Sequence, residues 1–137
     1  HYRSHSFPTR RSSDLTGPEL LTGSTRLKAG TATKMALNIL STGVMVRLGK
    51  VYGNRMVDVA ASNSKLVDRS LRILNDLVGL DRETGLVLLD QTGGSVKLAL
   101  MMAATGLDLP SATKRLKDHG QQLRAALKAC GASLLQA

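Results

Sequence analysis

The sequence predicts a mostly α-helical fold, and three observations support this prediction. Apolar residues recur at helical spacing in several stretches between about residue 31 and residue 128. Glycine follows most of these stretches, as is typical of helix ends. Signals for β-strands are poor, and a short extended piece at residues 19–22 is the main candidate. We therefore expect a chain built largely from helices.

The longest predicted helix covers residues 31–48, and Gly49 followed by Lys50 ends it. Its apolar residues share one spacing pattern: Met35, Ala36, Ile39, Leu40, Val44, Met45 and Leu48. We expect this helix to be largely buried. The following stretch, VYGNRMVDV, has a Gly-Asn pair between short apolar pieces and predicts an irregular connection or a tight turn.

A second helix is predicted to begin at a cap provided by Ser62 or Asn63 and to end at Gly79. Between these limits one face is apolar and the other is charged, which is typical of a helix that lies on the surface of a core. The apolar face contains Leu66, Val67, Leu71, Leu74, Leu77 and Val78, together with Ser70.

Shorter helices follow from Asp81 onward. The pattern predicts one at residues 82–90, a break at Gly93-Gly94, and a helix capped by Ser95 that runs to Gly106. Two more are predicted near residues 110–117, with Asp108 or Ser111 as the cap, and near residues 121–128. Together they predict a small orthogonal bundle from about residue 80, and no internal repeat is evident in the sequence.

The first fifteen residues, HYRSHSFPTRRSSDL, differ in character from the rest of the chain. They hold two of the three histidines, the only phenylalanine and no periodic apolar pattern. Residues 5–15 also correspond in frame to a nucleotide sequence that resembles a common sequencing adapter. We expect residues 1–15 to be an artefact without ordered structure, set apart from the fold, and the natural gene to be interrupted at Thr16.

Composition narrows the function classes. The formal net charge of +9 is compatible with binding nucleic acid, but Tyr52 is the only aromatic residue after the first fifteen, so platforms for base stacking are missing. We expect no nucleic-acid partner. The single cysteine, Cys130, cannot form an internal disulfide, which fits the cytoplasm. No apolar run reaches the length of a membrane span, so we expect no membrane partner.

Residues 16–34, TGPELLTGSTRLKAGTATK, form the densest polar stretch of the chain. Its chemistry suits an anion, because Ser24 and Thr25 offer hydroxyl donors and Arg26 and Lys28 add positive charge. Glycines allow close approach of main-chain amides, and the start of the following helix adds its positive end. The stretch therefore predicts a phosphate site that needs no cofactor. The alternative is that it is only a helix cap with solvated cations.

The other candidate residues give weaker signals. His119 is the only histidine after the first fifteen residues, and Cys130 stands alone, so the spacing of a metal site is not met. We expect no metal.

The stretch at residues 17–58, GPELLTGSTRLKAGTATKMALNILSTGVMVRLGKVYGNRMVD, resembles the N-acetylmuramic acid 6-phosphate etherases. The pattern is partly shared with the glucokinase regulatory proteins, and both belong to the sugar-isomerase-domain group. The resemblance continues more loosely through ASNSKLVDRSLRIL. It implies that residues 16–58 form the carboxy-terminal edge of an α/β sugar-isomerase domain with a parallel sheet. Residues 59–137 would then be a small helical carboxy-terminal domain.

The resemblance also implies an activity. Such a lyase cleaves the D-lactyl ether of N-acetylmuramic acid 6-phosphate to N-acetylglucosamine 6-phosphate and D-lactate, in peptidoglycan recycling and amino-sugar catabolism. The route is elimination followed by addition of water, with positioned carboxylates moving the protons. The catalytic glutamates of the family lie outside this stretch, and neither Glu19 nor Glu83 matches them. We assign no catalytic residue and expect the chain alone to be inactive.

Four residues match the family motif one by one: Ser24, Thr25, Arg26 and Lys28. We expect them in or beside the phosphosugar pocket of a homodimer. Two alternatives stay open. One is a non-catalytic regulator that binds a sugar phosphate, like the glucokinase regulatory proteins. The other is a small basic helical protein that binds nucleic acid or another protein.

Overall fold

The computed structural model describes residues 15–135, and the chain divides into two compact units, His1–Val44 and Met45–Ala137. Helices dominate the described residues, so the predicted mostly α-helical fold is confirmed. The adapter-like segment falls outside the described residues except for Leu15, and its interpretation stays a prediction.

The first unit contains a polar loop, residues 17–27, followed by helix α2 (Lys28–Arg47), which continues into the second unit. The predicted extended piece at residues 19–22 is wrong. This part of the chain turns instead, because the Ser24 amide donates to the Leu21 carbonyl at 2.9 Å and the Leu27 amide donates to the Ser24 carbonyl at 3.1 Å. Successive turns of this kind leave no extended backbone for a strand to use.

The predicted burial of α2 is also wrong within the described residues. Five apolar side chains of α2 are each more than half exposed: Met35, Leu37, Ile39, Leu40 and Val44. Leu48, which follows the helix directly, is also more than half exposed. Apolar side chains are found all around the circumference of α2. Ala29, near its start, is the residue of this helix that is buried. Helices of this composition normally lie inside a larger core.

The second unit begins with the end of α2 and a hairpin made of β1 (Val51–Tyr52) and β2 (Arg55–Met56). The strands are antiparallel, with Val51 opposite Met56 and Tyr52 opposite Arg55. The tight turn predicted from the Gly-Asn pair is confirmed, since Gly53 has a φ of +58° that favours glycine.

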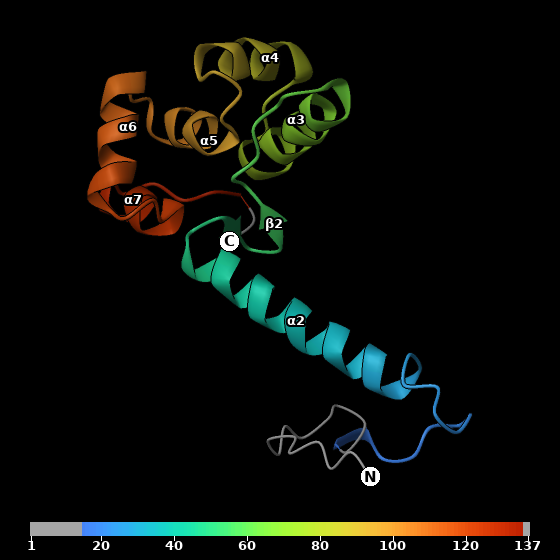
Figure 1. The fold of residues 1–137 in the computed structure, drawn as a ribbon. Helices are drawn as coiled ribbons and strands as arrows, with labels where there is room; N and C mark the ends of the chain where they lie inside the picture. Colours follow the sequence, from blue (N-terminus) through green and yellow to red (C-terminus); the bar gives the residue numbers. More distant parts are fainter. Residues whose placement is uncertain (1–14, 136–137) are drawn as a thin grey trace. The chain divides into compact units, whose positions relative to one another are not determined.

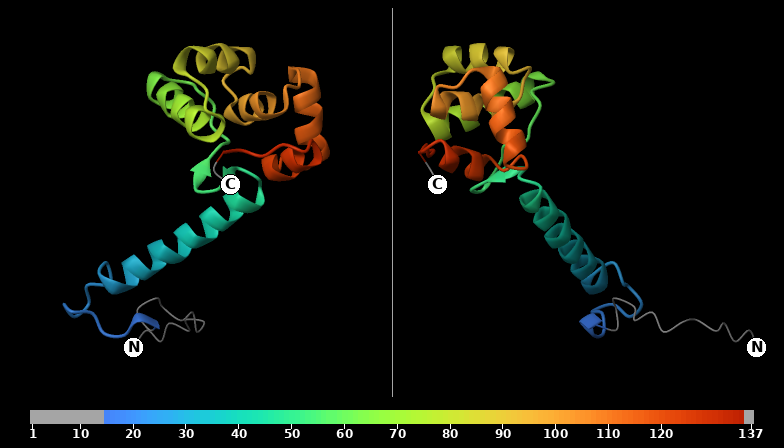
Figure 2. Two further views of the ribbon diagram at one scale, coloured as in Figure 1. Left: turned by 180° about the vertical axis from the view of Figure 1, so that it is seen from behind. Right: turned by 90° about the vertical axis from the view of Figure 1, so that its left-hand side faces the viewer.

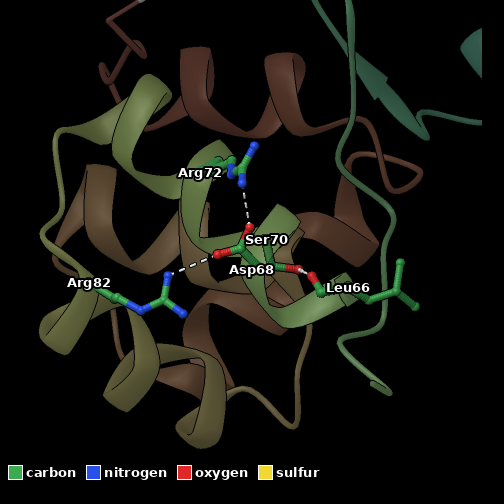
Figure 3. A network of polar contacts seen from close by, with 5 residues as sticks. All are labelled: Leu66, Asp68, Ser70, Arg72 and Arg82. Atoms are coloured by element: carbon green, nitrogen blue, oxygen red, sulfur yellow. Dashed lines mark hydrogen bonds and ion pairs between the residues drawn. The ribbon is translucent and has the colours of Figure 1, made fainter. Parts of the chain in front are cut away.

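Helix α3 (Ser64–Val78) follows the sequence prediction closely. Asn63 caps its start by accepting the Leu66 amide at 2.9 Å, and Gly79 ends it in the left-handed conformation. On its charged face, Asp68 binds Arg72 at 2.8 Å and Arg82 of the next helix at 3.0 Å (Figure 3). The acidic side chain thus ties the two helices together at the surface.

Four short helices complete this unit: α4 (Arg82–Gln91), α5 (Val96–Thr105), α6 (Leu109–Asp118) and α7 (Leu123–Ala129). Helix α5 is central, because it packs against α3, α4, α6 and α7 (Figures 1 and 2). The core between them is made mainly of leucines, and those that are almost completely buried include Leu74, Leu77, Leu100, Leu116 and Leu127.

The pair α4–α5 and the pair α6–α7 are built in the same way. Asp81 caps α4 by accepting the Thr84 amide, and Asp108 caps α6 by accepting the Ser111 amide. After each first helix, two consecutive residues have positive φ: 59° and 81° at Gly93-Gly94, and 59° and 63° at Gly120-Gln121.

The second helices of the two pairs start alike as well. Their N-cap residues have nearly the same backbone angles, φ −82° and ψ 105° at Ser95 against φ −86° and ψ 99° at Gln122. Buried positions also correspond at constant spacing: Gly85 with Ala112, Leu89 with Leu116, Val96 with Leu123, Ala99 with Ala126, and Leu100 with Leu127. The structure thus contains a repeat of two helix pairs that was not evident in the sequence.

Candidate functional site

The candidate site is the polar loop, which precedes α2 in the chain and folds into a series of tight turns. Besides the two turns already described, the Thr25 amide donates to the Gly23 carbonyl at 3.0 Å. Gly23 has a φ of +82°, and a Cβ placed there would meet no atom within 4 Å. Glycine is thus needed at this position for its backbone conformation and not for lack of space.

Glu19 links the two ends of the polar loop. Its carboxylate accepts the main-chain amide of Lys28 at 2.8 Å and that of Ala29 at 3.0 Å. These are among the first amides of α2, which have no partner within the helix. The amide of Ala29, followed by that of Lys28, holds the pKa of Glu19 below its ordinary value.

The next two amides of α2 are also satisfied. The Gly30 amide donates to the Thr25 carbonyl at 2.7 Å, and the Thr31 amide donates to the Leu27 carbonyl at 3.2 Å. The expectation that the start of this helix offers amides to a phosphate needs correction, because Glu19 and the loop carbonyls already accept them. An anion bound at this loop would therefore be held mainly by side chains.

Lys28 is placed differently from the other three predicted binding residues. Its ammonium donates to the Pro18 carbonyl at 2.9 Å and so closes the base of the polar loop beside Glu19. The positive charge stays in the loop, but part of its hydrogen-bonding capacity is used within the protein.

Ser24, Thr25 and Arg26 follow one another in the polar loop. Thr25 and Arg26 are exposed, Ser24 is half-buried, and none of the three side chains has a hydrogen-bond or ion-pair partner among residues 15–135. Two hydroxyl groups and one guanidinium are therefore available to an incoming anion, and guanidinium matches the geometry of phosphate oxygens.

A second polar cluster was missed from the sequence. Lys97 lies on α5 with 5% of its surface exposed, and its ammonium is 3.3 Å from Asp58 and 3.4 Å from the Gln121 carbonyl. Lys50 binds the same carboxylate at 3.0 Å. Burial raises the pKa of Asp58, but the hydrogen bond from Lys50 and the charge of Lys97 outweigh it and leave this pKa lowered.

Asp58, Lys50 and Lys97 together form the Asp58 cluster. It connects the hairpin, α5 and the turn before α7, which indicates a structural role. The sequence signal was weak, since Lys97 is a single cation in an apolar helix and its partner is distant in the chain.

Within the described part of the chain, no group of three His, Cys, Asp or Glu side chains could hold a metal ion. Among residues 15–135, no helix combines the length and apolar character needed to cross a bilayer.

Known proteins similar to the chain include several N-acetylmuramic acid 6-phosphate etherases. The chain is 73% identical over 123 residues to the N-acetylmuramic acid 6-phosphate etherase of Synechococcus sp. (strain CC9605), which covers 90% of the chain. It is 75% identical over 122 residues to that of Synechococcus sp. (strain CC9902) and 64% identical over 113 residues to that of Nostoc punctiforme. No family model matches the chain.

These identities confirm the resemblance noted from the sequence, and most of the chain is homologous to these etherases. The chain spans 39% of the length of the two Synechococcus relatives.

Proposed function

We propose that this chain is part of an N-acetylmuramic acid 6-phosphate etherase. The observation that carries the proposal is the shared name of relatives that are 64–75% identical to the chain. The enzyme would act in the cytoplasm as a lyase that releases D-lactate and N-acetylglucosamine 6-phosphate, in peptidoglycan recycling and amino-sugar catabolism. The chemistry would be elimination followed by addition of water.

The contribution of this chain to the site is recognition of the phosphate. Ser24, Thr25 and Arg26 carry donors that have no partner among residues 15–135, and Lys28 adds charge at the base of the polar loop. Hydrogen bonds to a charged group contribute about 1.5–3 kcal/mol each. A few of them hold a phosphomonoester without a cofactor. We assign no catalytic residue, and we expect the chain alone to be inactive.

The domain organisation forms part of the proposal. Residues 16–58 would close an α/β sugar-isomerase domain, residues 59–137 would be its helical carboxy-terminal domain, and the whole protein would be a homodimer. The exposed apolar side chains of α2, such as Ile39 and Leu40, support this organisation, because they need a larger core to cover them.

The test is an assay of D-lactate release from N-acetylmuramic acid 6-phosphate by the full-length protein that carries this segment. We expect release, with no added metal or cofactor required. Tight binding of the phosphosugar without release would instead favour the sugar-phosphate-binding regulator. Failure to bind any phosphosugar would contradict both.

A further inference from the structure

Glu19 stands out because it is an acidic residue at the base of a loop that is expected to bind an anion. Its two carboxylate oxygens receive the amides of Lys28 and Ala29, at 2.8 Å and 3.0 Å. The start of a long helix is a favourable place for a phosphate, because free amides and the helix dipole act together there. In this protein, its own carboxylate takes that place.

The bonds of Glu19 also determine the path of the polar loop. They join residues nine and ten positions apart, and the bond from the Lys28 ammonium to the Pro18 carbonyl spans the same gap. The loop between these bonds contains Ser24, Thr25 and Arg26. The two ends of the polar loop are therefore held together, and the residues with the free hydroxyl and guanidinium groups lie between these ends in the sequence.

We propose that Glu19 is a positioning residue for the phosphosugar site, an inference that rests on the proposed function. By capping α2 it holds the polar loop in the conformation that presents Ser24, Thr25 and Arg26. It also keeps the substrate phosphate away from the amides of the helix. The phosphate is consequently bound by side chains of the loop, and Glu19 does not touch it.

The experiment uses the full-length protein with Glu19→Ala or Glu19→Gln. We would measure KM and kcat for D-lactate release, the Kd for N-acetylglucosamine 6-phosphate by calorimetry, and Tm. Glu19→Ala should raise KM and Kd about tenfold, a value within the range expected for losing a helix cap, and should change kcat much less. Glu19→Gln should recover part of the loss, since its amide oxygen still accepts a hydrogen bond.

Asp81→Ala is the matched control. It removes the carboxylate cap of α4 in the other unit, where Asp81 accepts the Thr84 amide at 2.8 Å. If Glu19 acted only through general stability, both alanine variants would lower Tm and leave Kd unchanged. Such a result would overturn the inference.

Two further outcomes are decisive. Tighter binding of N-acetylglucosamine 6-phosphate by Glu19→Ala, which frees the amides of Lys28 and Ala29, would mean that Glu19 blocks a phosphate site at the helix amides, and it would overturn the inference. If the unmodified protein binds this phosphosugar but releases no lactate, the proposed enzymatic function fails. The Kd values of the variants still decide the role of Glu19 in that case.

Discussion

At the scale of single residues, Arg26 is the strongest candidate for direct contact with the phosphate. Its guanidinium is exposed and has no partner among residues 15–135. Removing a hydrogen bond to a charged group costs about 1.5–3 kcal/mol, so Arg26→Ala in the full-length protein should raise KM by about tenfold or more. Arg69→Ala, on the exposed polar face of α3, is the control and should leave KM unchanged. Equal effects of the two variants would contradict the assignment.

The Asp58 cluster gives a second prediction at this scale. Asp58→Ala removes the ion-pair partner of the buried Lys97 ammonium and leaves it the Gln121 carbonyl as its hydrogen-bond partner among residues 15–135, whereas Lys97→Met replaces a buried cation by an apolar chain of similar length. Leaving a buried charge unpaired lowers the free energy of unfolding, and the partial exposure of Asp58 reduces this loss. We expect Asp58→Ala to lower the stability of the full-length protein by about 1–3 kcal/mol more than Lys97→Met. Comparing their urea-unfolding midpoints checks this, and equal losses would refute it.

At the scale of elements, some helix caps are made by residues that are close in the sequence and others by residues that are distant. Asn63, Ser95 and Asp108 cap helices as the sequence predicted, because a cap depends on residues three positions apart. Glu19 was not identified as the cap of α2, because its partners are nine and ten residues away.

The internal repeat was missed because residue identity alone does not show it. It is preserved in backbone angles and in side-chain size, as at Gly85 and Ala112, more than in residue identity.

Acid should weaken three helix caps together. The pKa values of Glu19, Asp81 and Asp108 are all lowered by hydrogen bonds that their carboxylates accept. Their contribution to stability is therefore fully present above the ordinary values of 4.5 and 3.8 and is lost as the pH falls through the lower folded values. Asparagine caps helices without titrating. Asp81→Asn with Asp108→Asn should make the helical circular dichroism of the protein less sensitive to acid, and an unchanged titration would contradict this.

The repeat predicts that glycine is favoured at two equivalent positions, 94 and 121. Gln121 has a φ of +63°, a conformation that costs most residues about 1 kcal/mol and glycine almost nothing. Gln121→Gly should therefore stabilise the protein by up to about 1 kcal/mol. Gly94→Ala should destabilise it, since Gly94 has a φ of +81° and an added Cβ would lie 3.2 Å from the Ala61 amide. Thermal unfolding of both variants tests the pair, and a loss of stability in Gln121→Gly would contradict the equivalence.

At the scale of the whole molecule, the two units differ in how completely they are stabilised by their own residues. Residues 45–137 contain a leucine-rich core in which Leu74 and Leu100 have no exposed surface. Along α2, in contrast, Ile39 and Leu40 are 69% and 66% exposed. The helix itself could be predicted from the spacing of its apolar residues. Its surroundings could not, because they depend on residues that the local pattern does not contain.

This contrast predicts different behaviour for two pieces of the chain. A protein made of residues 16–137 carries the exposed apolar helix and should self-associate, since large exposed apolar patches drive association. A protein made of residues 50–137 lacks α2 altogether and should be monomeric with a cooperative unfolding transition. Sedimentation velocity and thermal unfolding of both pieces provide the test. Replacing Ile39 and Leu40 with Lys should reduce association of the longer piece but destabilise the full-length protein, where these side chains are proposed to be covered. A longer piece that stays monomeric would remove the main structural support for a larger surrounding domain.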